Sequence, residues 1–280
     1  MKLMRIGEAG HEVPCMEGPD GQARSIASLV DDIGPETLSG LRATLEGVDM
    51  DALPVVPTDN VRIGAPMAQP RNIYCIGLNY SDHAAEAGQP VPEQPILFNK
   101  SSGAYCGPND GIPHADHMTK LDWEVELGVV IGKTALGVSE ADALDHVWGY
   151  VTVNDVSERS WQIERGGQWT KGKSYPNFCP TGPWLVSADA VGDVQALDLR
   201  LEVNGERMQT GTTAKMVFGV AEIVSHLSQF LRLEPGDLIC TGTPPGVGMG
   251  MSPQKWLVPG DEVELEVAGL GVQRQRVVAA

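Results

Sequence analysis

The sequence lacks several features that would assign it to a class at once. Its five cysteines are far apart and form no C-x-x-C pair, so neither a disulfide framework nor a zinc knuckle is indicated and reduced thiols are expected. No apolar run approaches the roughly 18 residues of a membrane-spanning helix. The first residues lack the apolar core of a signal peptide. We therefore expect a soluble cytoplasmic protein with no membrane partner.

Basic residues are also scarce. The 280 residues include 20 Lys and Arg against 37 Asp and Glu, which gives a formal net charge of −17. Such a surface repels phosphate backbones, so we expect no nucleic-acid partner. The Gly- and Pro-rich string T-G-T-P-P-G-V-G at 241–248 lacks G-K-[ST] and precedes no helix, which excludes a P-loop.

Aromatic residues make up only 5% of the chain, whereas its 33 Gly and 20 Pro exceed average usage. Many turns and short strands are expected, so we predict an α+β fold that is rich in β-structure. Residues 1–65 are predicted to form a small N-terminal domain, and residues 66–280 the catalytic domain. Helical patterns are few, the clearest at 215–231, and they do not alternate with strands, which argues against a doubly wound sheet or a TIM barrel.

The most informative string present is D-W-E-V-E-L-G-V-V-I-G, which begins at Asp122. Its acidic and apolar residues alternate as on a strand, so Glu124 and Glu126 are expected on one face. Asp155 ends a second apolar run, G-Y-V-T-V-N-D, and would complete a site of three carboxylates. Oxygen ligands with no matching His or Cys favour Mg²⁺ or Mn²⁺ over Zn²⁺. About three positions on an octahedral ion would stay open to water and substrate, as is typical of a catalytic site.

E-x-E has a simpler interpretation, the solvated face of an edge strand. The apolar and glycine residues at 127–132 indicate a buried strand instead. Buried carboxylates need a partner, which would be either a metal ion or a Lys or Arg side chain.

Two further strings carry groups for acid–base chemistry and charge stabilisation. His83 and Glu86 stand three residues apart on a predicted helix, where the carboxylate could hold the imidazole as a general base; an exposed helical ion pair is the simpler alternative. Lys173, in K-G-K-S, is predicted to lie in a loop that either stabilises an oxyanion or is merely a basic surface.

Two other polar residues could reach the same cavity. Arg159 follows Asp155 by one helical turn, although a surface arginine is the commoner case. Thr243 lies in the Gly- and Pro-rich string at 241–248, which could bind an anion or serve as a turn between strands.

Taken in order, these strings resemble motifs of the fumarylacetoacetate hydrolase family: G-x-N-Y-x-x-H-x-x-E, E-x-E, N-D-x-S-x-R, and G-K-S with a distal T-G-T-P-x-G-V-G. The resemblance covers Arg71 to about Val277. It implies a β-rich roll of mixed strands with short helices, usually dimeric, so a homodimer is expected. It also implies that Mg²⁺ or Mn²⁺ is bound by Glu124, Glu126 and Asp155.

The same resemblance implies further site residues. His83 and Glu86 would form the catalytic dyad on a lid, and Lys173 would support the oxyanion. Contacts to the substrate would come from Tyr80, Arg159 and Thr243.

The implied reaction is the hydrolysis of a 2,4-diketo acid between C3 and C4 to pyruvate and a carboxylic acid. The strings N-Y-S-D-H-A-A-E-A-G and G-G-Q-W-T-K-G-K-S look most like bacterial enzymes that cleave L-2,4-diketo-3-deoxyrhamnonate, or the related fuconate, to pyruvate and lactate. Gln168, Trp169 and Lys171 would contact the hydroxylated tail. Leu78 departs from the Arg of many acylpyruvases, which argues against simple acylpyruvates. Ureidoglycolate lyase and oxaloacetate decarboxylase are alternatives, and a non-catalytic metal-binding relative is a remote one.

Overall fold

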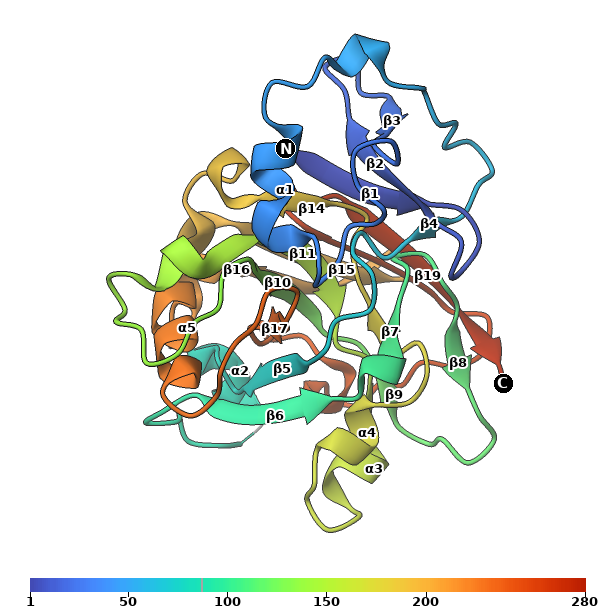
Figure 1. Ribbon diagram of the computed structural model, residues 1–280. Helices are drawn as coiled ribbons and strands as arrows, with labels where there is room; N and C mark the ends of the chain where they lie inside the picture. The colour runs from blue at the N-terminus through green and yellow to red at the C-terminus, as the bar shows by residue number, and fades with distance from the viewer. Residues whose placement is uncertain (87) are drawn as a thin grey trace.

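The computed structural model describes residues 1–86 and 88–280, except for the side chains of residues 83 and 85 (Figure 1). The strands are β1 (Lys2–Ile6), β2 (Val13–Glu17), β3 (Ala23–Ser25), β4 (Ile63–Gly64), β5 (Ile73–Gly77), β6 (Ile96–Lys100), β7 (Tyr105–Cys106), β8 (Ile112–His114), β9 (Leu121–Asp122), β10 (Val125–Ile131), β11 (Val147–Asn154), β12 (Ser157–Glu158), β13 (Cys179–Pro180), β14 (Leu185–Ser187), β15 (Asp198–Val203), β16 (Glu206–Thr212), β17 (Leu238–Cys240), β18 (Glu262–Val267) and β19 (Val272–Ala279).

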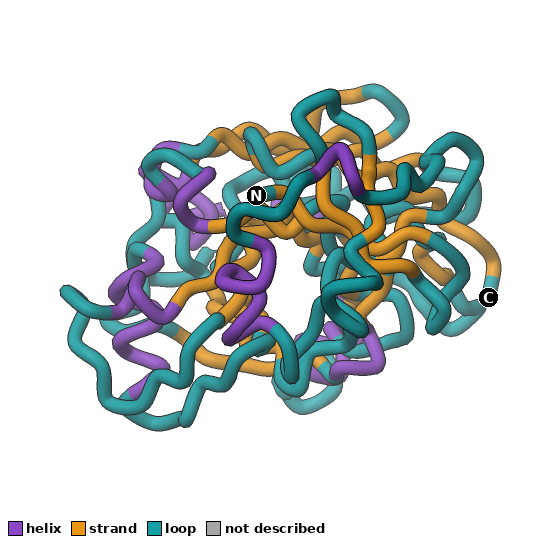
Figure 2. The backbone as a smooth tube through the Cα atoms, turned by 45° about the horizontal axis from the view of Figure 1, so that its top comes forward, coloured by secondary structure: helices purple, strands orange, loops and turns teal. Residues whose placement is uncertain are grey.

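The α-helices are short and separated by loops (Figure 2). They are α1 (Leu38–Leu45), α2 (Ser81–Glu86), α3 (Arg159–Ile163), α4 (Thr170–Lys173) and α5 (Val220–Ser228). Single 3₁₀ turns occur at Met50–Ala52, Ser102–Ala104, Ala143–His146, Ala188–Ala190, Val194–Ala196, Thr213–Lys215 and Gly248–Gly250. Within the described part of the chain, no helix is long and apolar enough to cross a bilayer.

A large mixed sheet organises the molecule. Its strand order is β3-β2-β1-β14-β11-β10-β17-β5-β6, with β4 beside β1. A second sheet, β16-β15-β18-β19-β8, packs across β10 and β11 of the first. Two short pairs, β9 with β12 and β7 with β13, lie beside them. The fold is therefore mixed and strand-rich, which confirms the predicted class.

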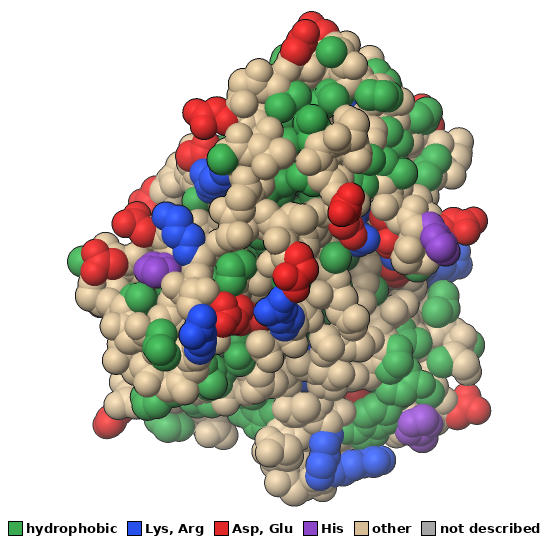
Figure 3. Space-filling view, viewed as in Figure 1, with side chains coloured by type: hydrophobic (Ala, Val, Ile, Leu, Met, Phe, Trp, Pro, Cys, Tyr) green, Lys and Arg blue, Asp and Glu red, His purple; other side chains and the backbone are tan. Residues whose placement is uncertain are grey.

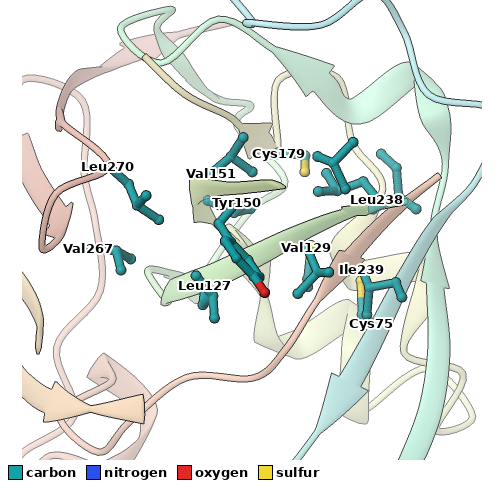
Figure 4. Packing of buried hydrophobic residues seen from close by; sticks show 14 of the residues in the cluster. Cys75, Leu127, Val129, Tyr150, Val151, Cys179, Leu238, Ile239, Val267 and Leu270 are labelled. Atoms are coloured by element: carbon teal, nitrogen blue, oxygen red, sulfur yellow. The ribbon is translucent and has the colours of Figure 1, made fainter. Parts of the chain in front are cut away.

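The core lies around β10, β11 and β17 (Figure 4). Every residue of β10 and β11 is buried, because sheet neighbours flank both strands and other elements cover both faces. The β-branched and aliphatic residues at 125–131 suit such a central strand. Gly128 allows a close approach, since a Cβ there would lie 2.6 Å from Val151. E-x-E consequently sits in a central strand and not on a solvated edge.

The N-terminal strands continue the large sheet, because β1 pairs with β14 in antiparallel register. The helix α1 turns Leu38, Leu41 and Leu45 into the core. In Figure 1 these elements form the upper part of the molecule. The boundary at residue 65 stays a prediction.

The helix predicted over 215–231 is shorter in the structure. The backbone is extended at Met216 (ψ 139°) and at Gly219 (ψ 167°), so α5 begins only at Val220. The loop predicted around Lys173 was also wrong, because residues 170–173 form the helical turn α4.

Charged groups are distributed over the surface. Acidic side chains are spread across the face seen in Figure 3, with no single dense cluster on it.

Candidate active site

Glu124, Glu126 and Asp155 form a buried cluster of carboxylates. One oxygen atom from each lies within 4.8 Å of the others. Their exposed fractions are 5%, 2% and 0%, so water screens the cluster very little. The period-two alternation of the sequence therefore predicted the shared face correctly.

Strand pairing brings the third carboxylate to the first two. β10 and β11 are antiparallel, with Val125 opposite Asn154. One residue beyond this pair, the Asp155 amide donates to the Glu124 carbonyl at 2.9 Å. The Glu124 amide donates to Asn154 Oδ1 at 3.1 Å, which ties the two strand ends together.

Two lysines reach into the cluster from other elements. Lys173, at the end of α4, donates to Glu124 Oε2 at 2.8 Å and to Asp155 Oδ2 at 2.7 Å. Lys100, at the end of β6, contacts Asp155 Oδ1 and donates to the Val156 carbonyl at 3.2 Å. Burial by itself lowers a lysine pKa, but the negative groups around each ammonium, Asp155 first among them, together outweigh burial and raise the pKa of both side chains.

Arg159 links the cluster to a fourth buried acid. Its Nε donates to Asp122 Oδ2 at 2.8 Å, and its Nη2 lies 2.6 Å from Glu124 Oε1. Asp122 also accepts hydrogen bonds from the amides of Gly248 and Met249 at 2.7 Å and 3.1 Å. The side chain of Arg159 is thus held from one end, with its guanidinium facing the carboxylates.

The surroundings of Glu126 disfavour its charged form. Burial raises its pKa well above the usual value, and repulsion from Asp155 and Glu124 adds to the shift. Gly242 donates its amide to Glu126 Oε2 at 2.8 Å. Unlike Glu124 and Asp155, Glu126 forms no ion pair among those seen in the described residues.

A cavity of about 520 Å³ opens onto this cluster. Its polar lining consists of Gln89, Glu124, Glu126, Arg159, Gln162, Lys173 and Thr243. Its apolar lining consists of Ile76, Leu78, Ile96, Phe98, Ile163, Trp169 and Met249. Charge is therefore gathered at the end that holds the carboxylates, and the remaining wall is apolar or neutral.

The predicted dyad of His83 and Glu86 belongs to α2. Glu86 accepts the Gly246 amide at 3.0 and 3.2 Å, which anchors the end of α2. The side chain of His83 lies outside the described residues, although its backbone is part of α2. The role of the dyad therefore stays a prediction.

Tyr80 and Thr243 are both buried beside the cluster. The Tyr80 hydroxyl has no hydrogen-bond partner among the described residues, and burial followed by the charges of Glu126 and Asp82 raises its pKa. Thr243 lines the cavity, but its hydroxyl donates to the Val125 carbonyl and accepts from Gln209, each at 2.8 Å.

Gln168 and Lys171 are not among the residues that line the cavity. Lys171 is exposed and donates to the Arg165 carbonyl at 2.8 Å. Trp169, between them, does line the cavity with its indole.

Sequence reasoning missed Lys100, Asp122 and Gln162. The available signals were a lysine ending the apolar run I-L-F-N-K and an acid just before the E-x-E strand. Neither signal identifies the partner, which depends on sheet order.

The residues present suit a hard divalent cation. Three buried carboxylates converge from two strands, and the trio offers oxygen ligands only. A divalent cation would also offset the mutual repulsion that acts on Glu126.

Comparison with known proteins gives consistent matches. The family profile of the fumarylacetoacetate hydrolase C-terminal domain matches residues 72–278. A Burkholderia lata protein described as "Putative hydrolase" is 53% identical over 98% of each chain. The structure of a fumarylacetoacetate hydrolase from Exiguobacterium antarcticum is 37% identical, with a TM-score of 0.88 over 100% of each chain.

Two further solved structures bear on the chemistry. A probable 2-hydroxyhepta-2,4-diene-1,7-dioate isomerase from Mycobacterium abscessus is 34% identical, with a TM-score of 0.82 over 100% of this chain and 99% of that one. Maleylpyruvate hydrolase from Sphingobium sp. SYK-6, in complex with manganese(II) and pyruvate, is 28% identical, with a TM-score of 0.83 over 100% of each chain.

Proposed function

This chain belongs to the fumarylacetoacetate hydrolase family, and on that premise we propose that it is a metal-dependent hydrolase of 2,4-diketo acids. The products are pyruvate and a carboxylic acid. The observation that carries the proposal is the buried trio of Glu124, Glu126 and Asp155, with Lys173 and Arg159 beside it at the inner end of the cavity. Similarity to a maleylpyruvate hydrolase bound to manganese(II) and pyruvate supports it.

The trio would hold Mg²⁺ or Mn²⁺. The bound ion would act as a Lewis acid toward the carboxylate and 2-keto oxygens of the substrate. Asp122, through Arg159, fixes the orientation of Glu124, and Lys100 fixes that of Asp155. Such supporting contacts set ligand geometry and typically affect metal affinity 10- to 100-fold.

Lys173 supplies the positive charge for the developing oxyanion at C4. Its ammonium group has three hydrogens, and two of them are used by Glu124 and Asp155. The third is left for the substrate oxygen, inside a site where little water screens the interaction.

The proton transfers are assigned to His83 and Glu86. His83 takes a proton from the water that attacks C4, and Glu86 sets the tautomer of the imidazole. The C3–C4 bond then breaks, and a proton is added at C3 to give pyruvate. Water supplies the oxygen of the new carboxylate, so the atoms balance without a redox partner.

A coupled assay for pyruvate tests the proposal directly. The substrates are acetylpyruvate, L-2,4-diketo-3-deoxyrhamnonate and oxaloacetate, each with chelator-stripped protein and with protein reloaded with Mg²⁺ or Mn²⁺. We expect metal-dependent pyruvate from the diketo acids and its loss in His83→Ala. Pyruvate from oxaloacetate alone would mean a decarboxylase instead.

An isomerase is the second candidate, because the Mycobacterium abscessus structure carries that description at 34% identity. Isomerisation of a 2-hydroxy-diene acid would use the same carboxylate trio and a proton shuttle, but no attacking water. Ultraviolet absorption of 2-hydroxyhepta-2,4-diene-1,7-dioate distinguishes the two. Loss of the diene signal without new carboxylic acid would favour the isomerase.

We also propose that the protein acts as a homodimer in the cytoplasm. The edge strand β6 presents Leu97, which is 37% exposed, does not line the cavity and is suited to burial against a second copy. The cysteines are free and buried, as suits a reducing compartment. Light scattering at micromolar concentration tests the dimer, and a monomer mass would contradict it.

A further inference from the structure

The cavity wall away from the carboxylates is built from apolar side chains, two of which are exposed to solvent. Ile163 on α3 is 50% exposed, and Ile96 on β6 is 36% exposed. Large aliphatic groups that face a cavity without cover lose hydration when an apolar ligand contacts them, which stabilises that contact. This wall therefore favours an apolar group over a polar one.

An aromatic pair forms the part of this wall closest to the charged end. Phe98 and Trp169 pack edge to face, with ring centroids 5.3 Å apart. Phe98 also lies under the Lys173 ammonium, which is 5.4 Å from its ring centroid. A substrate bound at the carboxylates would consequently extend its acyl group along these two rings.

The position of Trp169 is enforced by the fold. Gly77 ends β5, and a Cβ at that position would lie 2.3 Å from the indole Cζ3, so only glycine leaves room for the ring. The next residue, Thr170, donates its hydroxyl to the Asn99 carbonyl of β6 at 2.8 Å. The ring is thus held between β5 and β6 and is not a mobile surface group.

The cationic side chains that line the cavity are already paired with an acid. Among the described lining residues the cations are Arg159 and Lys173, and both form ion pairs with Glu124. The other polar side chains of the wall, Gln89 and Gln162, are neutral, and Gln162 Oε1 accepts from Arg159 at 3.0 Å. Among the described lining residues a second substrate carboxylate would find no unpaired cation, and burying it unpaired is costly.

We propose that the site selects 2,4-diketo acids with one carboxylate and an apolar acyl group, such as a phenyl or a medium-length alkyl group. Dicarboxylic and hydroxylated substrates are disfavoured. This inference rests on the proposed function, because it assumes that the diketo head binds at the carboxylate trio. The residues that determine the preference are Phe98, Ile163 and Trp169.

Binding of compounds that cannot be hydrolysed provides the first test. The 2-oxo acids 2-oxopentanoate, 2-oxo-4-phenylbutanoate and 2-oxoadipate share the head group, lack the 4-keto group and differ only in the tail. Titration calorimetry with the Mg²⁺-loaded protein should give the phenyl compound an affinity about tenfold or more above that of 2-oxopentanoate. The dicarboxylate should bind no better than 2-oxopentanoate, and tighter binding of 2-oxoadipate would overturn the proposal.

Variants locate the preference. Trp169→Ala should reduce the advantage of the phenyl compound to less than about threefold, because the larger of the two aromatic rings in the wall is lost and Phe98 loses its packing partner. Phe230→Ala is the matched control, since Phe230 is 69% exposed near the end of α5 and does not line the cavity; it should leave the advantage unchanged. Equal loss in both variants would contradict the assignment.

Lys171 provides the opposite test. If its ammonium turned toward the cavity and received a second carboxylate, Lys171→Ala would weaken 2-oxoadipate selectively, and that result would overturn the proposal. We expect no change on 2-oxoadipate.

Kinetics separates this inference from the proposed function. Benzoylpyruvate should have a kcat/KM about tenfold or more above that of acetylpyruvate, with fumarylpyruvate below both. Cleavage of acetylpyruvate without a preference for benzoylpyruvate would refute only the inference. Failure to cleave any diketo acid, with the preference in binding retained, would refute only the proposed hydrolysis.

Discussion

Two clusters of charged side chains in this protein have similar composition and opposite organisation. At the N-terminal end, Arg5 pairs with Asp32 and Glu12, and Arg62 pairs with Glu12 and Asp110. Each arginine there contacts the two oxygens of one aspartate with two nitrogens. At the candidate active site the acids instead converge on one another, within 4.8 Å.

The difference separates an ion-pair network from a site that needs a cation. In the N-terminal cluster every carboxylate named above is paired with a guanidinium group. Its negative charge is therefore compensated within the protein, without a metal ion. At the active site Glu126 faces Asp155 and Glu124, and burial together with their repulsion raises its pKa. Acidic composition alone does not distinguish the two, whereas the direction in which the carboxylates point does.

The largest expected effect comes from removing a member of the trio. Glu126→Gln keeps the size of the side chain but removes a charged ligand, so kcat/KM for the preferred diketo acid should fall by more than about 100-fold. The fold should tolerate the change, because a source of buried repulsion is removed. The pyruvate assay and thermal melting with and without Mn²⁺ measure both effects.

Glu264→Gln is the matched control for that change. Glu264 lies on β18, outside the cavity, and pairs with Arg200 and Arg274. Its loss should leave kcat/KM within about twofold and should leave the stabilisation by Mn²⁺ intact. Mn²⁺ that stabilises Glu126→Gln as much as the original protein would contradict the assignment of the ligand.

The second effect concerns Lys100, which holds Asp155. Lys100→Met preserves the unbranched shape and leaves a buried carboxylate less compensated, so the free energy of unfolding of the metal-free protein should fall by about 3–5 kcal/mol. Because a bound divalent cation supplies the missing positive charge, Mn²⁺ should raise the melting temperature more in this variant than in the original protein.

Lys255→Met tests whether the loss of any paired lysine has this result. Lys255 forms an exposed pair with Glu206, so its removal should cost less than about 1 kcal/mol. If Lys100→Met and the original protein have the same free energy of unfolding in the presence of a chelator, the contact between Lys100 and Asp155 does not stabilise the fold.

The sequence predicted the positions of the three carboxylates because these positions follow from the local geometry of two strands. The alternation in 122–131 predicted the shared face of Glu124 and Glu126, since side-chain direction on a strand depends only on position. Asp155 was predicted because it ends the neighbouring apolar run. Both predictions needed only two adjacent strands, and those strands pair directly.

The rest depends on contacts between segments far apart in the chain. Lys100 reaches Asp155 from β6, which is separated from β11 by three strands of the sheet, and no pattern near residue 100 indicates that partner. Lys171 and Trp169 are two residues apart, yet only the indole lines the cavity, because α4 turns the chain between them. The helix over 215–231 was predicted too long, since periodicity does not detect the extended backbone at Met216.

The third expected effect comes from a substitution in the N-terminal cluster, which should lower the stability of the protein without changing its activity. Arg62→Met leaves Asp110 without its guanidinium partner and Glu12 with Arg5 alone, and Arg62 is 29% exposed at its side chain. An intermediate cost of about 1–3 kcal/mol in the free energy of unfolding is expected from urea denaturation. Arg207→Met, which breaks an exposed pair with Glu202, should cost less.

A measurement of the activity of folded Arg62→Met tests whether this substitution affects stability alone. Arg62→Met should retain its kcat/KM for acetylpyruvate within about twofold, because the N-terminal cluster lines a separate cavity of about 360 Å³. A loss of more than tenfold at full folding would mean that the two clusters are coupled.

The smallest effect is a pH dependence carried by Glu12. Burial alone would raise the pKa of its carboxyl, but the hydrogen bond from Arg62 and the charges of Arg5 and Arg62 lower it below the usual 4.5. A carboxyl whose pKa is lowered in the folded state stabilises the protein above its unfolded pKa, and that contribution is lost as the pH falls through the folded pKa. Glu12→Gln should therefore be less stable than the original protein at pH 7, and the gap should narrow below pH 4.5. Urea denaturation at pH 7 and pH 3.5, on either side of the pI of 4.6, measures it, and a gap that widens in acid would reverse the assigned sign.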